Sequence, residues 1–378
     1  MKRIGIITWY WGNYGSILQA YALCEYLSMQ GFDCEVVRHH VNGDFRTQVR
    51  YRLSHDSLSS NAANIKNKAA GMIYGRIQKD ERAERMRTFE RFVEENLRLS
   101  ERAYTNQDYA ECTDYDAYIC GSDQIWNPSF TFLSPFYWLA FLPEGKDAIA
   151  YAPSLGTAEF GNDDRETVKR YLLRFKAIST REENSGKMLE TIDPRIRVSH
   201  VSDPTFLPGA DFWKSKVKST KSEKKYLFAY LIKGNDRQRE YIEAVARERQ
   251  LELVTYPYLE NHRITKSERT WGDVRCFGDD PFDFLTKIYN AELIITDSFH
   301  CSVFSLQFRK DFYALKKCGD TTGQFNRIEQ LLKACGMSGR MISEDKPFRR
   351  AETDFDASDR AIAALREESR AYLDRALS

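Results

Sequence analysis

The residues best suited to chemistry lie in the stretch 291–308, which reads AELIITDSFHCSVFSLQF. Its apolar run at 293–296 predicts a buried parallel strand. Ser298 is a residue type that caps helices, and the apolar residues at 303–308 predict a short helix. His300 falls at that helix N-terminus, where free backbone N–H groups bind anions. Because ligands of open α/β sheets lie past the carboxyl ends of the strands, His300 either faces a ligand or only hydrogen-bonds the loop.

Two further polar clusters follow predicted strands in the first half of the chain. Arg181 and Glu182 come directly after a strand at 176–179, and the planar fork of an arginine suits a carboxylate or a phosphate. Ser122 and Asp123 come directly after a strand at 117–120. Ser122 is expected to bind substrate. Asp123 could accept a proton from a sugar hydroxyl, or it could cap a turn.

The loop 9–16, WYWGNYGS, separates a strand at 3–8 from a helix at 17–30. Asn13 or Ser16 could cap this helix, and both are expected to contact substrate. The β–loop–α–β opening is Rossmann-like but lacks G-x-G-x-x-G. Its aromatic residues favour a sugar face over a dinucleotide, or they simply cover the sheet edge.

Strands and helices alternate through both halves, which predicts an α/β protein of two Rossmann-like, doubly wound domains facing across a cleft. The expected N-terminal domain spans 1–208 and contributes Arg181. A lysine-rich linker at 209–225 leads to a C-terminal domain at 226–350, which contributes His300. An amphipathic helix closes the chain within 356–378. The remaining expected elements are strands at 34–37, 147–151, 196–201, 226–231, 251–256, 274–277 and 312–315, helices at 76–98, 163–175, 236–250, 281–290 and 326–335, and a polar insertion at 41–75.

The composition excludes several classes of protein. A net charge of +1 over 378 residues gives no electrostatic footprint for nucleic acid. No apolar run reaches the length of about 18 residues that a membrane span needs, and the start MKRIGIIT reads as a strand, so a cytoplasmic protein is expected.

The eight cysteines contain no C-x-x-C pair and no zinc spacing, so free thiols and no metal are expected. Cys301 follows His300 at a helix N-terminus, a position that can lower a thiol pKa. A catalytic thiol there is the minor alternative to a packing residue.

Six segments together resemble the polysaccharide pyruvyl transferases, and they occur in that family's order over most of the chain. They are NYGSILQAYAL (13–23), YICGSDQIWNP (118–128), YAPSLG (151–156), ISTREENSG (178–186), VSDPTFL (201–207) and TDSFHCSVFSLQF (296–308).

The resemblance implies a glycosyltransferase B-like fold whose C-terminal helix returns to the first domain. It also implies transfer of pyruvate from phosphoenolpyruvate to two sugar hydroxyls, giving a cyclic ketal and phosphate, with no cofactor. The acceptor would be a bacterial surface polysaccharide or its lipid-linked precursor, which would bring the protein to the inner membrane face. Arg181, Phe299 and His300 occupy positions that serve the donor in related enzymes. The backbone amides around Ser298, Phe299 and Cys301 could hold its second anionic group.

One departure from the family pattern concerns the residue two positions before the histidine. Many members have arginine there, and this chain has Ser298. Arg309 or Lys310 could supply the missing cation. Two alternatives stay open at this point: a nucleotide-sugar glycosyltransferase of the same fold, and a catalytically silent glycan-binding protein.

Overall fold

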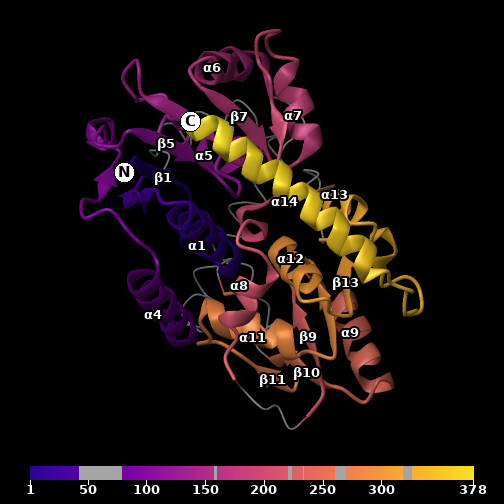
Figure 1. Ribbon diagram of the computed structural model, residues 1–378. Helices are drawn as coiled ribbons and strands as arrows, with labels where there is room; N and C mark the ends of the chain where they lie inside the picture. The colour runs from indigo at the N-terminus through magenta and orange to yellow at the C-terminus, as the bar shows by residue number, and fades with distance from the viewer. Residues whose placement is uncertain (42–78, 157–159, 220–223, 233, 260–269, 318–325) are drawn as a thin grey trace.

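The computed structural model describes residues 1–41, 79–156, 160–219, 224–232, 234–259, 270–317 and 326–378. Nearly all of the polar insertion expected at 41–75 therefore lies outside the described residues. Two sheets of six parallel strands form the centres of the two halves (Figure 1).

The first sheet has the strand order β2-β1-β5-β6-β7-β8, and every pairing in it is parallel. Its central strands are apolar and buried on both faces, as the strands of parallel sheets are. The order reverses between β1 and β5, so the loops after these two strands share one edge. Its strands are β1 (Arg3–Ile7), β2 (Asp33–Val36), β5 (Ala117–Cys120), β6 (Asp147–Ala150), β7 (Ala177–Thr180) and β8 (Ser199–His200).

The second sheet has the order β11-β10-β9-β12-β13-β14, which is the 3-2-1-4-5-6 order of the Rossmann fold. Its switch point lies between β9 and β12, where Thr296 pairs with Tyr230 at the carboxyl ends of both strands. The expected α/β fold with two Rossmann-like halves is confirmed. The strands are β9 (Tyr226–Tyr230), β10 (Glu252–Thr255), β11 (Val274–Arg275), β12 (Leu293–Thr296), β13 (Phe312–Leu315) and β14 (Met341–Ile342).

The helices lie close to their predicted positions, although β8 and β11 are shorter than the strands expected there. A minor sheet pairs β3 (His39–His40) with β4 (Tyr104–Thr105). The longer helices are α1 (Tyr14–Met29), α4 (Lys79–Asn96), α6 (Asn162–Leu172), α7 (Glu183–Glu190), α9 (Asp236–Glu248), α11 (Pro281–Asn290), α12 (Phe299–Gln307), α13 (Asn326–Ala334) and α14 (Phe355–Leu377).

Helix α1 is buried on almost every face because both halves of the chain pack against it. Asn13 caps it by accepting a hydrogen bond from the amide of Ser16, so the helix begins earlier than residue 17. The Tyr14 ring stacks on Phe284 of α11 with centroids 4.7 Å apart, and its hydroxyl donates to the Asp279 carbonyl. One apolar core therefore continues from the first sheet into the second.

Arg85 of α4 joins the two halves by a polar contact. Its buried guanidinium donates to the carbonyl oxygens of Pro257, Cys276 and Phe277, all in the second half. A guanidinium offers five donors, so one side chain satisfies three backbone acceptors that would otherwise be buried unpaired.

The segment expected to be a linker contains a short packed helix, α8 (Ala210–Ser215). Trp213 is fully buried there, packs edge-on against Phe304 of α12 and donates to the Thr205 carbonyl. The lysine-rich composition of this segment did not predict a packed helix, because one large aromatic residue, Trp213, supplies most of its packing.

The last helix, α14, starts beside the second half and ends on the first (Figure 1). Arg309 pairs with Asp356 near its start. Near its end, Ser369 accepts a hydrogen bond from the Ser202 amide, and the Tyr372 hydroxyl donates to the Ala150 carbonyl. Among the described helices, none is long and apolar enough to cross a membrane.

Candidate functional site

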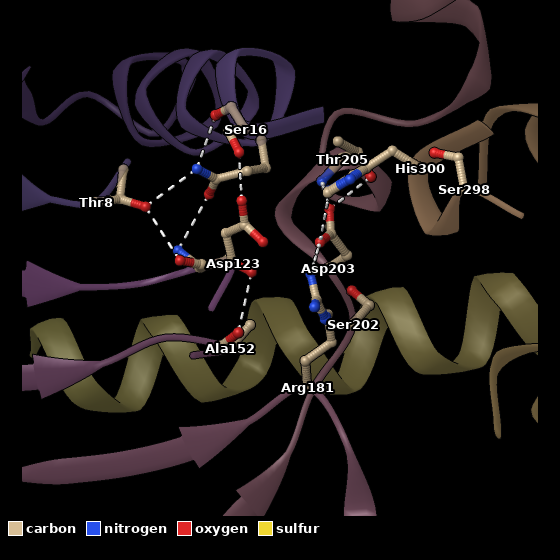
Figure 2. A network of polar contacts seen from close by, with 12 residues as sticks. Thr8, Ser16, Asp123, Ala152, Arg181, Ser202, Asp203, Thr205, Ser298 and His300 are labelled. Carbon is tan, nitrogen blue, oxygen red and sulfur yellow. Dashed lines mark hydrogen bonds and ion pairs between the residues drawn. The ribbon is translucent and has the colours of Figure 1, made fainter. Parts of the chain in front are cut away.

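Three chain segments meet at the carboxyl ends of the two sheets. Arg181 follows β7, His300 lies in the first turn of α12, and Asp203 follows β8 and caps the short 3-10 helix Pro204–Phe206. Arg181 and His300 come from different halves of the chain. Both were expected at the site, and the structure places them around one carboxylate (Figure 2).

Asp203 is that carboxylate, and it is fully buried. Its Oδ2 accepts a hydrogen bond from Arg181 Nη1 at 2.8 Å and lies 3.4 Å from His300 Nε2. Its Oδ1 accepts from the amide and the hydroxyl of Thr205 at 3.0 and 2.7 Å. The 3.4 Å separation makes an ion pair when the imidazole is protonated, but Nε2 has no hydrogen-bond partner among the described residues.

The charges of this group are mutually dependent. Burial alone would raise the pKa of the Asp203 carboxyl, but the imidazolium of His300 and the guanidinium of Arg181 hold that pKa well below its usual range. Burial opposes the charge on Arg181 as well, but the carboxylates of Glu182 and Asp203 raise the pKa of its guanidinium. Asp203 is therefore ionised at any pH near neutrality.

Arg181 is 6% exposed, and one of its guanidinium nitrogens is unused. Its Nε donates to Glu182 Oε1 at 3.0 Å, and its guanidinium carbon lies 4.3 Å from the centre of the Phe299 ring. Its Nη2 has no hydrogen-bond partner in the described part of the chain. A buried guanidinium with an unused N–H is prepared to bind an anion.

The N-terminus of α12 offers fewer amides than expected. Ser298 caps the helix with its hydroxyl, which accepts from the Cys301 amide at 3.4 Å, and the Ser298 amide donates to Thr296 Oγ1 at 3.0 Å. The amides of Ser298 and Cys301 are thus already used. No acceptor from the described residues meets the amides of Phe299 and His300, so these two remain for a ligand.

Gly15 of α1 lies directly against the His300 ring. A Cβ added to Gly15 would lie 2.0 Å from His300 Nδ1, closer than any real contact. Gly15 lies within the helix, where its missing side chain leaves room for the imidazole.

A second polar cluster lies beside the first, at the ends of β1 and β5 (Figure 2). The Ser16 hydroxyl donates to Asp123 Oδ2, and the Asn13 amide group donates to Ser16 Oγ at 3.0 Å. The structure thus brings together Asn13, Ser16 and Asp123, three residues that the sequence named separately. Ser122 is fully buried, and its hydroxyl donates to the Ala152 carbonyl at 2.9 Å, so its polar group serves the backbone.

Cys301 is fully buried, and burial raises its thiol pKa to about 12. A thiol with that pKa is protonated near neutral pH, which favours the packing role over catalysis. The seven cysteines in the described residues are all free, as expected, and Cys318 lies outside them.

The aromatic loop after β1 divides into buried and accessible rings. Tyr10 and Tyr14 are buried, while Trp9 and Trp11 are partly exposed. The Trp9 ring lies 6.0 Å from that of Phe130, which is 47% exposed and lies in the short helix α5 (Pro128–Thr131) after β5. Trp9, Trp11 and Phe130 are therefore the rings of this region that are accessible to a sugar.

The expectation that Arg309 or Lys310 replaces the family arginine is wrong. Both follow the C-terminal end of α12, opposite the end that carries His300. Arg309 pairs with Asp356 and Asp359, and Lys310 donates to the Tyr289 carbonyl. The length of α12 therefore separates Arg309 and Lys310 from the site.

Sequence reasoning missed Asp203, although the segment VSDPTFL carried a usable signal. An aspartate directly after a strand, followed by proline, caps a turn at the edge where ligands bind. Its contacts with both Arg181 and His300 are tertiary contacts, which no local sequence pattern predicts. Among the described residues, no group of His, Cys, Asp and Glu is arranged to hold a metal ion.

Comparisons with known proteins add fold and family. A comparison with curated proteins finds no significant match. A Listeria monocytogenes structure described as a UDP-N-acetylglucosamine 2-epimerase is 10% identical with a TM-score of 0.51, and the match covers 99% of this chain and 90% of that one. The Staphylococcus aureus MnaA–UDP structure is 14% identical with a TM-score of 0.49, covering 98% and 90%. These likenesses concern the fold alone.

The family model for polysaccharide pyruvyl transferase matches residues 13–316 of this chain. That range is more than half of the 378 residues and includes Arg181, Asp203 and His300. The chain therefore belongs to the polysaccharide pyruvyl transferase family, a family of transferases.

Proposed function

We propose that the protein transfers the pyruvyl group of phosphoenolpyruvate onto two hydroxyls of a sugar. The product is a cyclic ketal, phosphate is released, and the sugar belongs to a bacterial surface polysaccharide or its lipid-linked precursor. One observation carries this proposal: a single buried carboxylate, Asp203, holds Arg181 from one half of the chain and faces His300 from the other.

Arg181 is proposed to bind one anionic group of the donor. Its Nη2 is unpartnered within the described residues, while Asp203 and Glu182 fix the rest of the guanidinium. Because the hydrogen bonds from Nε and Nη1 hold the planar guanidinium in place, the direction of Nη2 is fixed, and binding an anion there costs little side-chain entropy.

His300 is proposed to protonate the methylene carbon of the donor. The Asp203 carboxylate lies 3.4 Å from His300 Nε2, where it can orient the imidazole as the carboxylate partner of a catalytic histidine does. As the first sugar hydroxyl attacks the central carbon, a C–O bond forms and the methylene becomes a methyl group. Asp123, hydrogen-bonded to Ser16, is the candidate to accept the proton from that hydroxyl.

The second half of the reaction breaks the bond between the central carbon and the phosphate oxygen. The second hydroxyl then bonds to the same carbon, and its proton leaves with the phosphate. Two C–O bonds form and one breaks, so the product is a ketal. No step of this scheme needs a redox cofactor.

The acceptor is proposed to lie across the aromatic loop of the first half. Trp9, which follows β1, and Phe130 of α5, which follows β5, present accessible rings, and the C–H faces of sugars stack on such rings. Donor and acceptor would then meet between the Asp123 cluster and the Asp203 cluster.

The proposal is tested by incubating the protein with phosphoenolpyruvate and a panel of oligosaccharides from bacterial surface polysaccharides. Phosphate release that depends on the sugar, together with a ketal methyl signal in the NMR spectrum of the product, is the expected result. Sugar transfer from a nucleotide sugar, with no phosphate released from phosphoenolpyruvate, would overturn it.

A further inference from the structure

Arg327 is a cation that neither the family pattern nor the chemistry above assigns. It lies in the first turn of α13, a helix that packs against α12, and it is 8% exposed. Its guanidinium carbon lies 5.9 Å from the centre of the Phe299 ring, and that of Arg181 lies 4.3 Å from the same centre. Phe299 thus has two guanidinium groups around one ring.

The charges already at the site make a second cation necessary for a dianion. The charge of Arg181 faces the carboxylates of Glu182 and Asp203, and Asp123 acts on it from further away. Even with His300 protonated, these groups carry more negative than positive charge. A donor with a phosphate and a carboxylate would be repelled unless another positive group faced it.

Unused donors indicate where that dianion would lie. The Nη2 of Arg181 is buried and unpartnered within the described residues, and the amides of Phe299 and His300 are open at the N-terminus of α12. All of these groups surround Phe299. The guanidinium carbons of Arg181 and Arg327 lie 4.3 and 5.9 Å from the centre of its ring, so both positive charges lie close to these unused donors.

We propose that Arg327 binds the second anionic group of the donor and so replaces the cation that the family carries at the position of Ser298. This inference rests on the proposed function, because it assumes that the ligand is phosphoenolpyruvate. Here the guanidinium comes from α13 instead of from the residue before Phe299. The side chain of Ser298 is then free to cap α12.

The test is calorimetric titration of the full chain with phosphoenolpyruvate, inorganic phosphate and pyruvate. Arg327→Met removes the charge and keeps most of the stem, and it should raise the dissociation constant for phosphoenolpyruvate about 10- to 100-fold, the range for a lost charge-assisted contact. Arg327→Lys should recover part of the affinity. If the affinity for inorganic phosphate falls in parallel, Arg327 binds the phosphate of the donor; if the affinity for pyruvate falls, it binds the carboxylate.

Lys333→Met is the matched control, because Lys333 is an exposed cation on the same helix. It should bind the donor as the wild type does. If Arg327→Met and Lys333→Met bind phosphoenolpyruvate equally well, the role of Arg327 is refuted while the proposed function stands. If the wild type does not bind phosphoenolpyruvate, the proposed function fails and this inference fails with it. A thermal melt of each variant identifies any loss of affinity that comes from misfolding. If Arg327→Met is misfolded, the affinity of Arg327→Lys for phosphoenolpyruvate decides whether Arg327 binds the donor.

Discussion

Replacing Gly15 by alanine is the sharpest perturbation of the site, because it reaches His300 without touching a polar group. A Cβ at position 15 would lie 2.0, 2.5 and 2.8 Å from His300 Nδ1, Cγ and Cε1. Ordinary contact begins near 3.4 Å, so the ring or the helix must move by about 1.4 Å. The imidazole lies 3.4 Å from Asp203 Oδ2 in the native arrangement, and a shift of that size disturbs the pair.

The magnitude follows from how steeply catalysis depends on position. A displacement of about 1 Å at a reacting group can cost about 100-fold in rate, so Gly15→Ala should lower turnover by about that factor. The free energy of unfolding should change only modestly. Crowding costs about 1–3 kcal/mol, while alanine in place of glycine within a helix returns about 0.5–1 kcal/mol.

The assay is phosphate release from phosphoenolpyruvate with an acceptor that the wild type uses, alongside a thermal melt. Gly339→Ala is the control, because a Cβ there meets only Ala351 at an ordinary 3.8 Å. In a His300→Ala background, Gly15→Ala should cost nothing further. A folded Gly15→Ala protein with wild-type turnover, or an equal loss in the His300→Ala background, would refute the reasoning.

Four further outcomes are expected. His300→Ala and Arg181→Ala should each lower turnover by orders of magnitude while the melting curve stays cooperative; wild-type rates in either variant would remove that residue from the site. Asp203→Asn should destabilise the fold by about 1–3 kcal/mol, because it removes one of the two carboxylates that pair with the buried Arg181 guanidinium and leaves Glu182 as the remaining ion-pair partner. The lowered pKa of Asp203 makes this contribution complete above the unfolded value of about 3.9, so the difference in melting temperature from wild type should narrow as the pH falls below it. Phe130→Ala should raise KM for the sugar and leave phosphoenolpyruvate binding unchanged, whereas equal effects on both ligands would argue against an acceptor platform. Cys301→Ala should keep turnover within a few-fold of wild type, and loss of turnover in a folded variant would reinstate a catalytic thiol.

Much of the fold could be predicted because its signals are local. The apolar run at Leu293–Thr296 and the cap at Ser298 sit next to one another in the chain, and both appear where the pattern placed them. Pro281 marks the first position of α11 in the same way. Short-range patterns of this kind set the element order, and the order of elements determines a doubly wound fold.

The arrangement of the site could be predicted only in part. His300 and Arg181 were identifiable because each follows a strand, but Asp203, which connects them, becomes visible only when β8 and α12 meet. The role of Gly15 depends on a ring contributed from the other half of the chain. Arg327 has no motif at all, since its position beside Phe299 results from the packing of α13 on α12.

The expectation about Arg309 failed for a related reason. Nearness in sequence to His300 suggested nearness in space, but a helix carries successive turns away from its N-terminus. The residue that replaces the family cation is better sought among the neighbours of Phe299 than among residues close to it in the chain.

The central claim is that the Arg181 guanidinium from the first half and the His300 imidazole from the second half bind one small dianion, phosphoenolpyruvate. Calorimetric titration with phosphoenolpyruvate of the wild type, Arg181→Ala, His300→Ala and the double variant tests it most directly. The account predicts binding by the wild type, weaker binding by each single variant, and a double variant whose loss is smaller than the sum of the two, because both side chains share Asp203. Wild-type affinity in both single variants, or a wild type that binds a nucleotide sugar and not phosphoenolpyruvate, would contradict it.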